Sequence, residues 1–105
     1  MYRQFYGYIL SSLSRATYVG VTNNLLNRVW QHRNEGGSRF AKKYRIDRLV
    51  HFEVFSDSYN AISREKEIKG WRREKKVKLI EANNPDWRDL AIDWEIPSSA
   101  TQPVP

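Results

Sequence analysis

The sequence has no cysteine among its 105 residues, so the fold uses neither disulfide bonds nor thiolate metal ligands. No apolar run approaches the length of a membrane span, and the N-terminal residues lack the apolar core of a secretory signal. Neither an internal repeat nor a base-reading motif is visible. These absences favour a cytoplasmic protein that has no contact with membranes and does not read base sequence directly.

What the sequence does contain is enough apolar surface for one modest core. Apolar residues make up 40% of the 12.5 kDa chain, and four of them are tryptophans, which argues against disorder. Residues 96–105 are rich in proline, serine and threonine. We expect one domain over residues 1–95 and a flexible tail over residues 96–105.

Positive charge is concentrated in the first half of the chain. The net charge is +6, and residues 1–50 hold nine Lys or Arg against two acids. The densest stretch, which we expect to bind nucleic acid, contains Arg39, Lys42, Lys43, Arg45 and Arg48. Such a block attracts phosphate backbones. The alternative is a solvated basic loop with no ligand.

Periodicity and turn signals predict an α/β (α+β) domain. Strands are expected over residues 2–11, 17–21 and 49–55, and helices over residues 25–33, 58–71 and 72–83. The short turn between the first two strands predicts an antiparallel hairpin. The order is β-β-α-β-α-α, around a small and mostly antiparallel sheet. Near the C-terminus we expect four apolar residues to clamp the chain onto the core, namely Trp87, Leu90, Ile92 and Trp94.

Strand alternation places two tyrosines on one face of the hairpin. Tyr8 and Tyr18 share that face with Gly20, while Ile9 and Val19 fall on the other. A phenol whose proton is relayed onward can act as a base, and the missing side chain at Gly20 leaves room for a phosphate and a hydrated metal. The alternative is that both tyrosines simply pack.

Arg28 and His32 lie one helical turn apart and project from one face. An arginine can hold a phosphate in a bidentate fork, and a histidine can carry a proton near neutral pH. The alternative interpretation is that Arg28 and His32 simply belong to an exposed polar helix face next to Trp30.

Glu65 is a single carboxylate on an apolar helix face. At about 100° per residue it shares an arc with Ala61 and Ile68, whereas Glu67 points away. A carboxylate among apolar neighbours needs a metal or an ion-pair partner. Mg²⁺ needs only one or two protein carboxylates because waters and phosphate oxygens complete its shell. The alternative is a pair with a nearby Arg or Lys.

Together these residues resemble the GIY-YIG nuclease superfamily, including its small stand-alone bacterial members. The similarity runs from residue 2 to about residue 80, and its most specific part extends from Tyr18-Val19-Gly20 to Arg28 and His32. The stretch around Glu65 is the second anchor. The first triplet reads Tyr6-Gly7-Tyr8, so only its closing tyrosine matches the family pattern.

The resemblance implies a central three-stranded antiparallel sheet flanked by helices, and a divalent-metal-dependent endonuclease that hydrolyses DNA. It implies that Tyr18, with Tyr8, activates the attacking water and that Arg28 binds the scissile phosphate. His32 would assist proton transfer, and Glu65 would hold one Mg²⁺ or Mn²⁺. Without a separate targeting domain, DNA structure or a partner protein would choose the site, as in repair or recombination. The alternative is a nucleic-acid-binding module with little or no activity.

Overall fold

The computed structural model describes residues 3–35 and 39–94. Its elements follow in the order β1 (Phe5–Ser11), β2 (Thr17–Thr22), α1 (Leu25–Glu35), α2 (Arg39–Tyr44), β3 (Arg48–Phe55), α3 (Ser58–Lys69) and α4 (Arg73–Asn83). These two ranges fall within the domain expected over residues 1–95. The tail expected over residues 96–105 lies outside the described residues. No helix in these two described ranges is both long and apolar enough to span a membrane.

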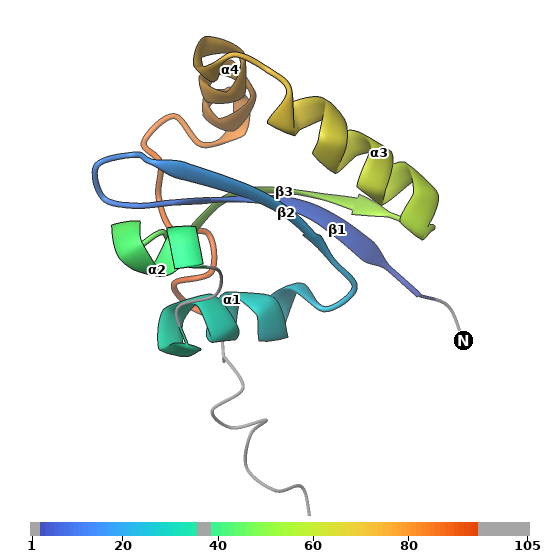
Figure 1. Ribbon diagram of the computed structural model, residues 1–105, viewed down its shortest axis with the longest axis horizontal. Helices are drawn as coiled ribbons and strands as arrows, with labels where there is room; N and C mark the ends of the chain where they lie inside the picture. The colour runs from blue at the N-terminus through green and yellow to red at the C-terminus, as the bar shows by residue number, and fades with distance from the viewer. Residues whose placement is uncertain (1–2, 36–38, 95–105) are drawn as a thin grey trace, which may run out of the picture.

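The three strands form one antiparallel sheet in the order β2-β1-β3. Helices α1 and α2 lie on one side of this sheet, and α3 and α4 lie on the other (Figure 1). Each side has its own core. Tyr8 and Leu10 pack with Leu25 and Val29 of α1, whereas the core beneath α3 and α4 contains Ile9, Val19, Val50, Ile68, Ile80 and Trp87. The alternation predicted for the hairpin is therefore confirmed.

The helix boundaries follow capping chemistry that the sequence carries. The Asn24 side chain accepts the backbone N–H of Asn27 at 3.1 Å, which satisfies one of the unpaired donors at the start of α1. Asp57 does the same for Asn60 at 2.9 Å and begins α3. Helix α3 ends at Lys69, and Gly70 separates it from α4.

Two sequence-based expectations were wrong. The basic stretch is not a loop, because Arg39–Tyr44 forms the short helix α2 and Arg48 begins β3. Arg45 ends α2 with a φ of 54°, a left-handed conformation that lets the chain turn into β3. In the C-terminal segment Trp87, Leu90 and Trp94 pack against the core, but Ile92 is 71% exposed. Local patterns could not show which side of that segment meets β3.

Candidate active site

Tyr8 lies at the centre of the hairpin, directly opposite Gly20 in the β1–β2 register. Its side chain is 1% exposed and covers Gly20 so closely that a Cβ there would overlap the phenol. The space above Gly20 therefore holds the Tyr8 ring, not a phosphate and metal as the sequence suggested. Only glycine at position 20 allows the Tyr8 phenol to approach β2 this closely.

Arg28 reaches the Tyr8 phenol from α1. Its Nη1 donates a long hydrogen bond of 3.5 Å to Tyr8 Oη. Burial raises the pKa of Tyr8, and Tyr18 and Glu65 raise it further, while the nearby Arg28 charge lowers it in part. The phenol is therefore protonated at neutral pH and can donate a hydrogen bond but cannot accept a proton.

His32 is buried beside both tyrosines, one turn beyond Arg28. Its ring centroid is 5.4 Å from that of Tyr18 and 6.2 Å from that of Tyr8. His32 is only 5% exposed, so the exposed polar face considered for it is wrong. Burial, followed by the Arg28 charge, lowers the pKa of His32, and its buried Nδ1 has no hydrogen-bond partner among the described residues. His32 is thus a neutral imidazole with an unused polar atom.

Glu65 lies on α3 and completes the constellation formed with Tyr8, Tyr18, Arg28 and His32. The residue is 8% exposed and shares the buried face of α3 with Ala61 and Ile68, as the helical periodicity predicted. Its Oε2 forms an ion pair with Lys69 Nζ at 2.5 Å. The carboxylate also lies near enough to Tyr8 for its charge to contribute to the raised pKa of that phenol. The ion-pair alternative for Glu65 is therefore confirmed, and its role as a metal ligand stays a prediction.

Lys69 is the neighbour that the sequence reasoning missed. The signal was present, because Glu65 and Lys69 have the i,i+4 spacing in which glutamate and lysine pair on a helix. The Lys69 side chain is 53% exposed, so it can turn toward solvent when another cation takes its place beside the carboxylate. The Lys69 ammonium group already pairs with Glu65, so the position beside this carboxylate suits a positive charge.

The donor set at Glu65 fits a hard divalent cation. No group of three His, Cys, Asp or Glu side chains comes together within the described ranges, so a zinc site built from protein ligands does not fit there. A single carboxylate fits Mg²⁺ or Mn²⁺, whose remaining ligands would be waters and a substrate phosphate.

The predicted nucleic-acid-binding residues lie along α2 and the start of β3. Lys42, Lys43 and Arg45 are exposed and form no ion pair with any described residue, while Arg48 is half-buried. Arg39 begins α2. Lys43 Nζ lies 5.4 Å from the centroid of the Tyr44 ring. The unpaired cations leave this helix surface strongly positive.

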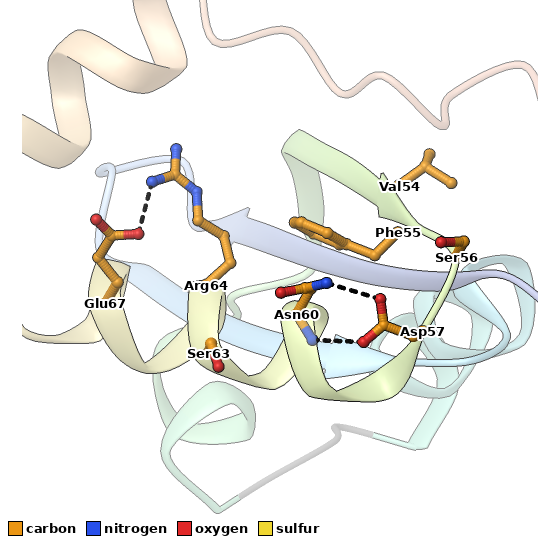
Figure 2. Close-up of a pocket in the computed structure, with 8 residues that line it drawn as sticks. All are labelled: Val54, Phe55, Ser56, Asp57, Asn60, Ser63, Arg64 and Glu67. Atoms are coloured by element: carbon orange, nitrogen blue, oxygen red, sulfur yellow. Dashed lines mark hydrogen bonds and ion pairs between the residues drawn. The ribbon is translucent and has the colours of Figure 1, made fainter.

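A cavity of about 580 Å³ lies elsewhere, between the end of β3 and the first turns of α3. Figure 2 shows Arg64 directed at Glu67 and Asp57 directed at Asn60 along its wall. Arg64 also donates to both carboxylate oxygens of Glu53. Although burial opposes it, hydrogen bonding to Arg64 holds the pKa of Glu53 below its usual value. The charges here neutralise one another, so this cavity lacks the reactive groups found around Tyr8.

Comparisons with known proteins show similarity over most of the chain. The model of the GIY-YIG catalytic domain matches residues 4–78. A UPF0213 protein of Pediococcus pentosaceus is 35% identical over 79 residues, which cover 75% of this chain and 83% of that protein. One from Haloquadratum walsbyi is 38% identical over 76 residues, covering 72% and 85%. The solution structure of a UPF0213 protein from Bacillus halodurans matches 86% of this chain and 97% of its own with a TM-score of 0.54, at 24% identity.

Proposed function

The chain belongs to the GIY-YIG catalytic domain family, and we propose that it is a divalent-metal-dependent endonuclease that hydrolyses DNA phosphodiester bonds. Nucleases of this family act on DNA and generally use a divalent metal. One observation carries the proposal. Four polar side chains from β1, β2 and α1 converge on one point, and a buried carboxylate from α3 lies within electrostatic reach of it.

Arg28 is the proposed phosphate-binding group. Its guanidinium is held beside Tyr8 by a long hydrogen bond that a phosphate oxygen would readily replace. Negative charge builds on the phosphate oxygens during hydrolysis, and a fixed guanidinium stabilises that charge. Tyr8, whose raised pKa keeps the phenol protonated, would donate a hydrogen bond to the phosphate or to the attacking water.

Tyr18 and His32 are the proposed proton-transfer pair. The attacking water bonds to phosphorus, the bond from phosphorus to the leaving sugar oxygen breaks, and that oxygen takes a proton from solvent. The attacking water's own proton must move away. Tyr18 would take that proton as it passes its own to the neutral imidazole of His32, whose ring lies beside it. The lowered pKa of His32 keeps a proton acceptor available at neutral pH.

Glu65 is the proposed metal ligand. When bound there, the divalent ion would supply positive charge that polarises the scissile phosphate. Lys69 would then release Oε2 and turn toward solvent. Binding through exposed cations, without base contacts, would select DNA by backbone and shape, which suits branched or flapped intermediates of repair and recombination.

The test is incubation of the purified protein with duplex, single-stranded, flapped and branched DNA, with and without Mg²⁺ or Mn²⁺. We expect metal-dependent cleavage by the wild type, and none by Arg28→Ala at equal folded content measured by circular dichroism. Binding without cleavage of any substrate would contradict the nuclease proposal and favour a binding module.

A further inference from the structure

The beginning of α4 carries a dense group of positive charges that the proposed active site does not use. Residues 72–76 contain two arginines and two lysines against one acid, Glu74. The Arg72 carbonyl accepts the backbone N–H groups of Lys75 and Lys76 at 3.1 and 3.3 Å, so the three residues belong to one helical turn. We call Arg72, Lys75 and Lys76 the α4 cation cluster.

Stability does not account for the α4 cation cluster. Cations are unfavourable at a helix N-terminus, and like charges three or four residues apart repel each other. Arg72 occupies the N-cap position yet forms no side-chain cap, where Ser, Thr, Asp or Asn would stabilise the helix. No member of the cluster forms an ion pair within the part of the chain that the structure describes. A local arrangement that opposes folding is typical of a binding surface.

Trp71 holds part of the cluster in place. Lys75 Nζ lies 4.4 Å from the centroid of the Trp71 ring, and the guanidinium carbon of Arg64 lies 5.0 Å from it. Trp71 itself is half-buried and packs against the core beneath α3 and α4. The ring therefore orients the Lys75 ammonium group while leaving the residue exposed.

The cluster lies close to the proposed metal ligand along the chain. Trp71 follows Glu65 by six residues and lies two residues beyond Lys69, where α3 ends. Helices α2 and α4 lie on opposite sides of the sheet (Figure 1). We propose that the α4 cation cluster is a second binding surface for the DNA backbone, separate from α2. The inference depends on the proposed function for the identity of the polyanion, and it follows from charge complementarity, since bound phosphates would relieve the repulsion within the cluster.

The double variant Arg72→Ser with Lys76→Gln tests this surface and keeps the Lys75–Trp71 contact. Binding of a labelled duplex and of a single strand of equal length is measured by anisotropy across a salt series without divalent metal. We expect weaker binding, and a log–log salt slope shallower by about 1.8 for the duplex and by about 1.4 for the single strand, because two phosphate contacts are lost. The melting temperature should stay the same or rise, since a cap replaces a repulsive cation.

The matched control is Arg3→Ser with Arg88→Gln, which removes the same charge from two exposed positions outside the cluster. The control should bind as the wild type does. If the cluster variant keeps the wild-type salt slope, or if the control loses as much affinity as the cluster variant, the inference is overturned and the proposed nuclease function is not affected. Wild-type protein that binds DNA through the cluster but never cleaves would contradict only the nuclease proposal. Absence of any DNA binding by the wild type would overturn both.

Discussion

At the scale of single residues, burial reinforces the neutral forms of Tyr8 and His32 near neutral pH. It raises the pKa of Tyr8 and lowers the pKa of His32, so the first stays a hydrogen-bond donor and the second stays a neutral acceptor. Tyr8 and His32 lie on the same side of the sheet, and they thereby receive the different roles of hydrogen-bond donor and proton acceptor.

Tyr18→Phe should keep the fold and the DNA affinity, since it removes only a hydroxyl. We expect single-turnover cleavage to fall by roughly two to four orders of magnitude, the usual contribution of acid–base catalysis. Tyr8→Phe should have a smaller effect because its phenol only donates a hydrogen bond, and His32→Ala should fall between the two. An almost active Tyr18→Phe enzyme beside an inactive His32→Ala enzyme would transfer the base role to His32.

His32 should make the protein sensitive to mild acid. The pKa of His32 is lowered in the folded state, so below about pH 6.5 the unfolded chain binds the proton first. Stability is therefore fully present above the unfolded pKa and decreases as pH falls toward the folded one. His32→Gln should flatten this part of the pH dependence of the unfolding free energy, measured by urea titration. An unchanged slope in the variant would show that another group is responsible.

Glu65→Gln should abolish metal-dependent cleavage while DNA binding persists, because the exposed cations on α2 and α4 are untouched. Its cost to stability should be small, since the Lys69 that loses its partner is half-exposed. Glu67→Gln is the matched control on the same helix. Glu67 is exposed and pairs with Arg64 away from the constellation, so that variant should cleave normally. Full activity of Glu65→Gln would contradict the proposed role of Glu65.

At the scale of secondary-structure elements, the β1–β2 hairpin positions the site through close contact between strands. Tyr8 can lie over β2 only because residue 20 has no side chain. The same contact brings the phenol within hydrogen-bonding distance of Arg28 on α1. The hairpin therefore couples strand packing directly to the placement of the proposed phosphate-binding group.

Gly20→Ala should displace the Tyr8 ring and disturb Arg28 with it. We expect a loss of about 1 to 3 kcal/mol in the free energy of unfolding, the usual cost of overpacking, together with reduced cleavage. Gly7→Ala is the control in the neighbouring strand, because a Cβ at Gly7 would meet only Phe55 Cε2 at an ordinary 3.7 Å. Equal stability of the two variants, measured by denaturant unfolding, would show that the Tyr8 ring can move aside freely.

At the scale of the whole molecule, the sheet separates two cationic helices. Helix α2 lies beside α1 on one side, and α4 lies beside α3 on the other (Figure 1). The proposed catalytic groups come from both sides, because Arg28 and His32 belong to α1 and Glu65 belongs to α3. A DNA backbone at the site is therefore expected to meet positive charge from both layers.

Reversing the charge of Lys42 and Lys43 should weaken DNA binding and make its salt dependence shallower, because fewer counterions are released. Cleavage of already bound DNA should fall much less, since neither lysine belongs to the catalytic group. Fluorescence anisotropy across a salt series, combined with single-turnover cleavage, separates the two effects. If the salt slope does not change, α2 is a solvated surface and the backbone contacts lie elsewhere.

Sequence periodicity by itself determined which side chains share a face. Alternation along the two strands placed Tyr8 and Tyr18 together, and the helical period placed Glu65 with Ala61 and Ile68. Both results depend only on the local geometry of the backbone, which neighbouring residues fix. For the same reason the order of the strands and of the longer helices along the chain was predictable. The three-stranded antiparallel sheet expected from the family resemblance is also confirmed.

Only the tertiary structure decided what those faces meet. The packing of α1 against the sheet buried His32, the approach of Tyr8 filled the space above Gly20, and Lys69 took one oxygen of Glu65. The short helix α2 was also missed, since six residues are too few for a helical period to be recognised. Burial and pKa depend on contacts between residues far apart in the chain, so a local pattern shows where a group points but not what surrounds it.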